Sequence, residues 1–151
     1  MPISATYAHT NLIARDWRAL AAFYQAVFGC TPVPPERDLA GDAVERGSQV
    51  PGARLQGVHL RLPGHGEAGP TLEIFGYNTL VEAPPAAANR PGFGHIAFVV
   101  PDVAAARAAV LAAGGRVFGD IVTTPAGSRT VTWVYVRDPE GNLVELQSWS
   151  S

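Results

Sequence analysis

Two histidines begin matching segments of the chain. His9 and His95 are each followed by an aspartate at the seventh position, and a glycine lies thirteen positions beyond that aspartate. The other members of the two copies are Asp16 and Gly29 in the first and Asp102 and Gly115 in the second. Repetition at fixed spacing is typical of a duplicated structural unit. The sequence therefore predicts two copies of one unit.

A glutamate in an apolar, strand-like run closes each copy. Glu73 and Glu145 each lie between two apolar residues, where a carboxylate is disfavoured unless it is paired or bound to a metal ion. Two imidazoles and two carboxylates suit a divalent ion of intermediate character, namely Zn, Ni, Co, Mn or Fe. A lone histidine on a strand is more often a hydrogen-bonded structural residue, but here the histidine recurs in register.

We therefore predict one divalent ion per site, with His9, Glu73, His95 and Glu145 as ligands. A site without cysteine, with carboxylates and with open coordination positions, favours catalysis over a closed structural zinc. Glu145 and Glu73 are the candidate catalytic bases, because a carboxylate on the ion lies beside the substrate.

Three further residues are candidates for a substrate pocket. His59 alternates with apolar residues, and Trp133 and Tyr135 lie on one face of a predicted strand. Each of them could equally be a structural residue with its polar atoms hydrogen-bonded, or an unreactive part of the pocket wall. His65 lies in a Gly/Pro loop and is expected to be solvated, and Cys30 is expected to be a small buried residue at a helix end.

The elements that must position these residues follow the order β-α-β-β-β in each copy. The first copy is predicted to contain a strand over 5–13, a helix from Asp16 to Gly29 and a hairpin of strands 54–62 and 71–77. The second is predicted to contain a strand over 93–100, a helix over 102–113 stopped by two glycines, and strands over 116–122, 129–137 and 143–149. Prolines and polar residues over 31–53 predict one short strand and a long mobile excursion.

The predicted fold class is α+β, with two tandem βαβββ modules forming a cup-shaped mixed sheet and helices on the outside. A length of 151 residues suits a single domain. We assign it as domain 1–151, made of module 5–77 and module 93–149 joined by linker 78–92.

The composition excludes some partners. The net charge is −2, with no long run of either sign, so neither nucleic acid nor a membrane surface is expected as a partner. A single cysteine and a first segment unlike a signal peptide favour the cytoplasm. We expect a small-molecule substrate and a homodimer.

The paired His and Glu positions, with the turn Asp138-Pro139-Glu140-Gly141-Asn142 leading into Leu143-Val144-Glu145-Leu146, resemble the vicinal oxygen chelate superfamily. This is the group of glyoxalases, bleomycin resistance proteins and extradiol dioxygenases, and the resemblance spans about residues 5 to 149. Ligands on the first and last strand of each module resemble glyoxalase I and methylmalonyl-CoA epimerase, which again implies His9, Glu73, His95 and Glu145. Epimerases place a separate catalytic glutamate earlier in the chain, and Glu45 is the candidate here.

The resemblance implies a metal-dependent lyase or isomerase that chelates neighbouring oxygens of a small substrate and moves a proton at the adjacent carbon. One alternative is an extradiol-type, ring-cleaving dioxygenase, which would require Fe(II). Another is a metal-free protein that sequesters a drug or metabolite, as bleomycin resistance proteins do.

Overall fold

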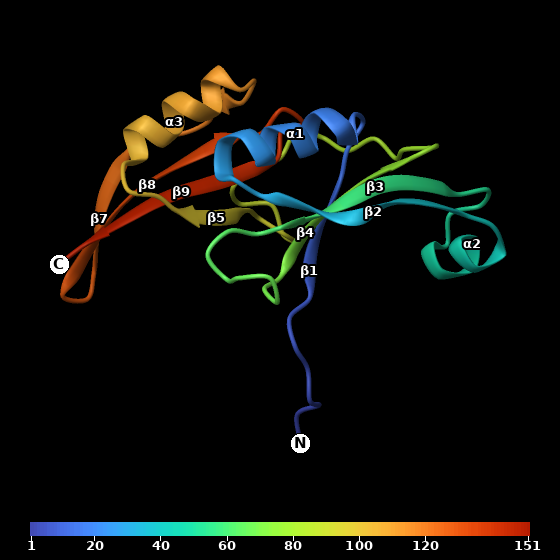
Figure 1. Cartoon of the computed structure of the whole chain (residues 1–151). Coiled ribbons are helices and arrows are strands. Elements are labelled where there is room, and N and C mark those ends of the chain that lie inside the picture. The colour runs from blue at the N-terminus through green and yellow to red at the C-terminus, as the bar shows by residue number, and fades with distance from the viewer. The chain divides into compact units, whose positions relative to one another are not determined.

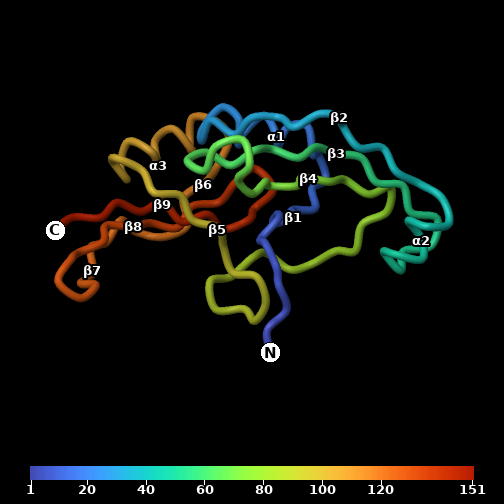
Figure 2. Tube along the Cα trace, turned by 60° about the horizontal axis from the view of Figure 1, so that its bottom comes forward, coloured from blue at the N-terminus to red at the C-terminus, as the bar shows by residue number.

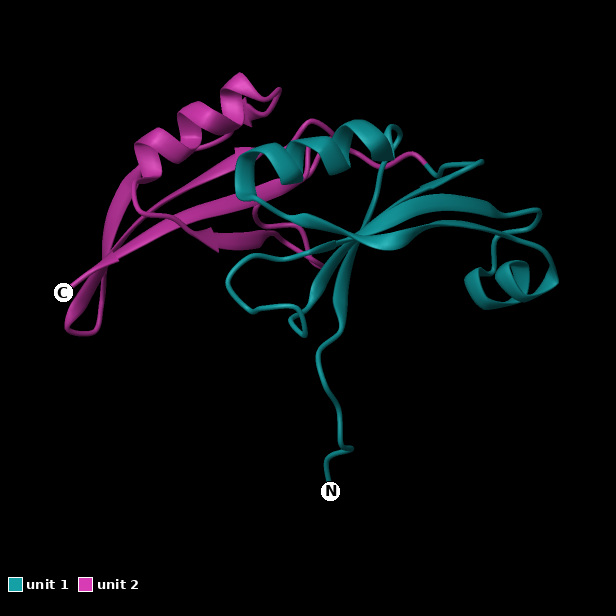
Figure 3. Ribbon diagram, viewed as in Figure 1, with its two compact units in different colours: residues 1–81 teal, residues 82–151 magenta.

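A computed structural model describes residues 1–151 and divides them into two compact units (Figure 3). Unit 1 is Met1–Val81 and unit 2 is Glu82–Ser151. The division falls within the segment 78–92, which the sequence assigns to a connector. None of the helices is long and apolar enough to cross a membrane.

Unit 1 has a four-stranded mixed sheet and two helices. Its elements are β1 (His9–Ile13), α1 (Trp17–Phe28), β2 (Thr31–Ala40), α2 (Asp42–Ser48), β3 (Arg54–Arg61) and β4 (Thr71–Tyr77). The strand order is β1-β4-β3-β2, in which β1 and β4 are parallel and the other neighbours are antiparallel. Helix α1 packs on β3 and β4 and covers one face of the sheet (Figure 1).

Unit 2 has the same plan with one additional strand. Its elements are β5 (Ile96–Val99), α3 (Val103–Ala112), β6 (Arg116–Val117), β7 (Val122–Ala126), β8 (Arg129–Arg137) and β9 (Leu143–Ser150). The order is β5-β9-β8-β6, and β7 also pairs with β8. Strands β5 and β9 are parallel, and α3 packs on β8 and β9 (Figure 1). The α+β class and the repeated unit are thus confirmed.

The aspartates of the repeat begin the helices, as predicted. Asp16 accepts a hydrogen bond from the backbone N–H of Ala19 at 3.0 Å, and Asp102 accepts one from Ala105 at 2.9 Å. Each side chain satisfies a backbone donor that has no partner within the helix. Gly29 ends α1 in the left-handed region at φ 71°, a conformation that residues with a Cβ rarely adopt.

The core of unit 1 lies between α1 and the sheet. The fully buried side chains there are Leu20, Tyr24, Leu60, Leu72 and Ile74. Their burial contributes roughly 1.5–3 kcal/mol each for the aliphatic members. Because strand side chains alternate, burying the even-numbered residues of β3 and β4 under α1 turns the odd-numbered residues to the opposite face. That opposite face carries His59 and Glu73.

The first strand of each unit is shorter than predicted. The sequence predicts strands over 5–13 and 93–100, whereas β1 begins at His9 and β5 covers only Ile96–Val99. Both are edge strands, and each is held only by parallel pairing with the last strand of its unit. Just outside that pairing, single backbone hydrogen bonds remain, from Thr71 N–H to Ala8 and from Val100 N–H to Gln147. The predicted strands extend beyond these contacts, so alternation alone overestimates the strand.

The prediction of a mobile excursion over 31–53 was wrong. Thr31–Ala40 form a ten-residue strand, and Asp42–Ser48 form a helix that lies where β2 passes into β3 (Figure 2). Strand β2 accommodates its prolines because it is an edge strand with a shift in pairing between Val33 and Arg37.

The prediction of one strand over 116–122 was also wrong. Only Arg116–Val117 pair there, and Val122–Ala126 form an unpredicted strand that makes a hairpin with β8.

Candidate metal centre

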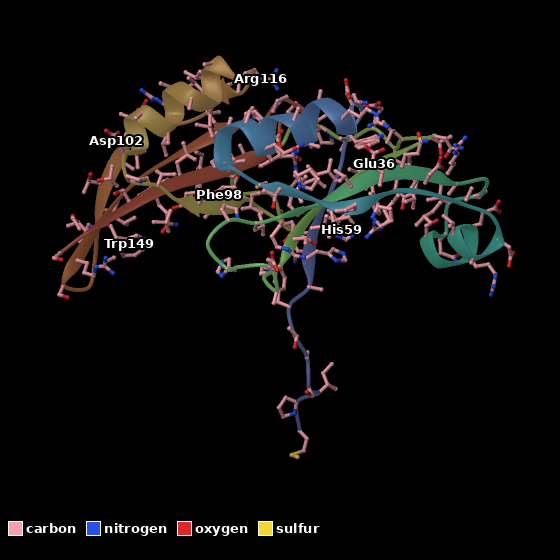
Figure 4. The ribbon with its side chains drawn as sticks, viewed as in Figure 1. Glu36, His59, Phe98, Asp102, Arg116 and Trp149 are labelled. Carbon is pink, nitrogen blue, oxygen red and sulfur yellow. The ribbon has the colours of Figure 1, made fainter.

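Unit 1 gathers two histidines and a glutamate on the face of its sheet away from α1. The pairing places Asn11 and His59 on either side of Glu73, and His9 lies two residues before Asn11 on β1. Figure 4 shows His59 projecting from β3 on the side opposite α1. The three adjacent strands β1, β4 and β3 thus supply one group each.

These groups are in direct contact. The Nε2 atom of His59 lies 2.6 Å from one carboxylate oxygen of Glu73, and Nε2 of His9 lies 3.5 Å from the other. The two imidazole rings are 5.4 Å apart and nearly perpendicular. The side chain of Glu73 is only 13% exposed, so its carboxylate needs these partners. The histidines point their Nε2 atoms at one carboxylate from two sides.

Two polar side chains make hydrogen-bond contacts with members of this cluster. Asn11 donates a hydrogen bond from Nδ2 to Oε1 of Glu73 at 2.8 Å, which orients the carboxylate. The hydroxyl of Thr71 lies 2.9 Å from Nδ1 of His59. When Nδ1 carries the proton and donates to Thr71, the lone pair of Nε2 is free to bind a metal ion. Such outer contacts set the tautomer of metal-binding histidines.

Burial lowers the pKa of His59, and Glu73 raises it in opposition. The net direction is downward, which favours the neutral imidazole. A neutral imidazole is the form that binds metal ions.

The donor set fits a divalent cation. One ligand atom each from His9, His59 and Glu73 can be chosen so that all lie within 4.8 Å of one another. Ligands of one zinc ion, each bound at about 2.0–2.2 Å, lie at most about 4.4 Å apart. A small movement of the side chains closes that difference. Nitrogen and carboxylate donors suit zinc, nickel, cobalt, manganese or iron.

Unit 2 carries a smaller version of the same arrangement. Nε2 of His95 lies 2.9 Å from Oε2 of Glu145, whose side chain is 16% exposed. The other oxygen of Glu145 accepts a hydrogen bond from Gln147 at 3.3 Å. Gln147 in turn accepts one from the indole N–H of Trp149. The carboxylate is thus oriented by a chain of side chains along β9.

Aromatic rings border this pair on β8. Tyr135 lies opposite Glu145 in the sheet, and its ring is 4.8 Å from that of His95. Trp133 stands 5.1 Å from Tyr135 and donates to the hydroxyl of Thr124 at 3.1 Å. Burial raises the pKa of Tyr135, with a smaller contribution from the charge of Glu145. The phenol therefore stays protonated at neutral pH and can donate a hydrogen bond.

The sheet registers identify His59 and Tyr135 as matched positions. His59 pairs with Glu73 and Tyr135 pairs with Glu145, and the two glutamates are the matched residues of the repeat. On the other side of each glutamate stand Asn11 and Ala97. The duplicated frame therefore holds a histidine in one unit where it holds a tyrosine in the other.

The predicted ligands therefore lie in two contacting pairs, His9 with Glu73 and His95 with Glu145. Each pair forms within its own unit, and a joint set of four ligands stays a prediction. His59 was predicted only as a pocket residue, and its contact with Glu73 was missed. The signal was available, because His59 alternates to the face opposite the core in a predicted hairpin with the strand of Glu73.

Three other residues discussed from the sequence lie outside both clusters. Glu45 is exposed on α2, and His65 is exposed in the loop between β3 and β4. Cys30 is buried, and its burial raises the thiol pKa to about 11. A protonated, buried thiol is a poor nucleophile and a poor ligand.

Two βαβββ-type units, each with a histidine at its first strand and a glutamate on its last, define a class of duplicated proteins with paired His and Glu positions. Residues 6–146 match the model of the Glyoxalase/Bleomycin resistance protein/Dioxygenase superfamily. The chain belongs to this superfamily, which includes enzymes. The resemblance inferred from the sequence is thereby confirmed.

Solved structures share the fold over almost the whole chain. A glyoxalase family protein from Bacillus cereus is 14% identical, with a TM-score of 0.81 and coverage of 99% of this chain and 97% of its own. A glyoxylase/bleomycin resistance protein/dioxygenase domain from Frankia is 16% identical, with a TM-score of 0.63 and coverage of 99% and 100%. A family enzyme from Burkholderia phytofirmans is 16% identical, with a TM-score of 0.57 and coverage of 95% and 98%. No curated protein matches the sequence.

Proposed function

We propose that the protein is a metal-dependent lyase or isomerase that moves a proton in a small substrate with neighbouring oxygens. The observation that supports this most is the preassembled contact of a histidine with a half-buried glutamate in each unit. A superfamily that includes enzymes is consistent with it. The proposed ligands are His9, Glu73, His95 and Glu145, as the repeat predicts.

A bound divalent ion supplies positive charge beside the two substrate oxygens and stabilises the negative charge that develops when the adjacent C–H loses its proton. Asn11 and Gln147 hold the two carboxylates in fixed orientations. The hydroxyl of Tyr135 stays protonated and can donate a hydrogen bond to a substrate oxygen.

Glu145 is the proposed proton carrier. Its carboxylate lies on a rigid strand and is oriented by His95 and Gln147. A carboxylate released from one of these contacts lies within reach of a substrate proton and can return that proton to the neighbouring carbon. Glu73 is the matched candidate in unit 1. It has more hydrogen-bonding partners than Glu145, so we favour Glu145.

Metal analysis of the purified protein tests the site. We expect about one divalent ion per chain, and both His9→Ala and His95→Ala should abolish stoichiometric binding. His65→Ala is the matched control, because His65 lies in an exposed loop. Removal of the ion by a chelator should lower the melting temperature, since an ion that binds only the folded state stabilises it. Stoichiometric metal in either ligand variant would reject the joint set of four ligands.

Solvent exchange tests the chemistry. Wild-type protein in heavy water should introduce deuterium next to the carbonyl of α-hydroxycarbonyl or acyl-thioester substrates, as followed by NMR. Glu145→Gln should retain much of the metal, because an amide oxygen can still coordinate, and should lose the exchange. Turnover of an α-deuterated substrate that leaves all of the label on its original carbon would rule out the proton-transfer assignment.

A ring-cleaving dioxygenase is the second candidate, and the cluster of His9, His59 and Glu73 favours it. Two histidines and one carboxylate are the donor set of non-haem Fe(II) oxygenases. That chemistry would be shown by oxygen consumption with a catechol substrate in the presence of Fe(II). A protein that binds no metal and sequesters a small molecule would fail both tests.

A further inference from the structure

Two arginines stand on either side of His59 on the open face of unit 1. Arg61 lies two residues beyond His59 on β3, so both side chains leave the same face of the sheet. Arg37 on β2 pairs with Gly57, which lies two residues before His59. Paired residues share a face, so Arg37 also lies on the face of the metal-binding cluster.

The hydrogen bonds of these two arginines differ from those of three other arginines of the unit. Arg18 pairs with Glu36, Arg46 with Asp42 and Arg54 with Asp38, all at the exposed surface. Arg37 donates instead to the carbonyl of Pro35, and Arg61 to the carbonyl of Gly69. A carbonyl accepts a hydrogen bond but does not neutralise the guanidinium charge.

The charge of Arg37 reaches the cluster. Burial is the largest cause that lowers the pKa of His59, and the charge of Glu73 opposes it. The charge of Arg37 adds to the lowering. Among the strand residues of this face, Arg37 and Arg61 contribute two positive charges, against the single negative charge of Glu73. The face therefore favours an anion even before any metal ion is added.

An open cavity adjoins the cluster on the side of Arg61. It has a volume of about 600 Å³ and is lined by the start of β2, the end of β3 and the loop that follows β3. Thr31, Val33 and Arg61 line it from the face of the cluster, and Val33 is the strand neighbour of His59. Glu67 also lines it, at the loop. The cavity has room for a part of the substrate that extends beyond the chelated oxygens.

The matched arginine of unit 2 shows which part of this arrangement is structural. Arg137 donates from Nη1 to the carbonyl of Gly141, just as Arg61 donates to Gly69 across its own turn. Arg137 also donates from Nη2 to Ala86 and stacks on Phe118 at 4.8 Å. Arg61 makes only the turn contact, so the rest of its guanidinium remains available to a ligand.

We propose that the substrate carries a second, anionic group, which Arg37 and Arg61 bind beside the chelating end. This inference rests on the proposed function, because it assumes that the substrate is held at the His9–His59–Glu73 face. A guanidinium matches the oxygens of carboxylates and phosphates in a two-pronged contact. The substrate class is therefore an α-oxygenated acid or ester with a carboxylate or phosphate a few bonds away.

Three probes separate the anionic group from the chelating group. Lactate, malate and 3-phosphoglycerate share an α-hydroxy acid, and they end respectively in a methyl group, a carboxylate and a phosphate. Each is titrated by calorimetry into the full-length protein loaded with zinc, whose metal content is measured separately. We expect malate or 3-phosphoglycerate to bind at least about tenfold more tightly than lactate, as charge-assisted hydrogen bonds to arginine allow.

The variants assign that preference to residues. Arg37→Gln and Arg61→Gln should each reduce it by about tenfold without changing metal content, and Arg61→Lys should restore part of it. Arg46→Gln is the control for a surface charge, and Arg137→Gln is the control for the turn contact. Neither control should change the preference. If Arg61→Gln fails to fold, Arg37→Gln alone still tests the proposal.

The outcomes distinguish this inference from the proposed function. Protein that takes up none of zinc, nickel, cobalt, manganese and iron would reject the proposed function and this inference with it. Protein that takes up zinc but binds all three probes equally would reject the inference alone. A preference that survives Arg37→Gln and Arg61→Gln would also reject it. The tighter of malate and 3-phosphoglycerate identifies the anion as a carboxylate or a phosphate.

Discussion

Opposite the strand glutamate, unit 1 carries His59 and unit 2 carries Tyr135. Glu73 consequently contacts two imidazoles and an amide, whereas Glu145 contacts one imidazole and an amide beside an aromatic wall. The backbone frame is the same in both units. At this matched position, His59 on β3 completes a cluster of three donors in unit 1. Tyr135 on β8 instead leaves a pair of two donors in unit 2 and adds a phenolic hydrogen-bond donor.

The next pair of facing residues along the same strands also differs between the two units. In unit 1, Phe75 lies over Gly57 so closely that a Cβ there would come within 2.3 Å of the Phe75 ring. In unit 2 the matched pair is Gln147 and Trp133, which both make polar contacts. Unit 1 therefore closes its cluster with a packed apolar row. Unit 2 extends its pair with side chains that make polar contacts.

The largest expected effect is on metal affinity in unit 1. Glu73→Ala leaves His9 and His59 without their shared carboxylate, and metal affinity should fall more than about 100-fold, since outer partners alone are worth about 10–100-fold. Competition with a chromophoric chelator measures it. Glu67→Ala, in the exposed loop, is the control. A variant at Glu73 that keeps wild-type affinity would show that the cluster does not hold the ion.

Exchanging the matched residues tests the comparison directly. His59→Tyr makes unit 1 resemble unit 2 and should lower metal affinity by about 10–100-fold, whether His59 binds the ion or orients Glu73. Tyr135→His should raise affinity by adding a donor beside His95 and Glu145. The same chelator competition measures both. Unchanged affinity in both variants would make the exchange irrelevant to metal binding.

The helix caps should behave alike in the two units. Asp16→Ala and Asp102→Ala each remove one side-chain hydrogen bond to a helix N-terminus and should cost about 0.5–2 kcal/mol of stability. Urea unfolding measures that cost, and metal affinity should not change. Lost metal with unchanged stability in either variant would assign that aspartate to the site instead.

The smallest effect is expected at Cys30 in unit 1. The matched residue of unit 2 is Arg116, which is exposed. The pKa of about 11 keeps the thiol protonated, so a thiol reagent at pH 8 should modify the protein only after unfolding. Because the thiol ionises at lower pH in the unfolded chain, its stabilising contribution is complete below about pH 9 and is lost as the pH rises toward 11. Cys30→Ala should remove that pH dependence. Rapid modification of folded protein would contradict this assignment.

The sequence predicted the repeat and the helix starts, because these depend on local spacing. It did not predict how His59 and Glu73 meet, since that depends on the register between β3 and β4. It also missed β7 and most of β2, because edge strands with prolines lack the apolar alternation of central strands. The homodimer, the cytoplasmic location and the joint set of four ligands stay predictions.

The parallel pairing of the first and last strand in each unit has a kinetic consequence. His9 and Glu73 are 64 positions apart and His95 and Glu145 are 50 apart, so each pair forms only when nearly a whole unit has closed on itself. Contacts of such long sequence separation form late, because loop-closure entropy opposes them until the intervening strands are in place. A chain emerging from the ribosome therefore has no cluster in unit 1 until residues beyond β4 have been made. Capture of the ion by the four proposed ligands would then require that both units have finished folding.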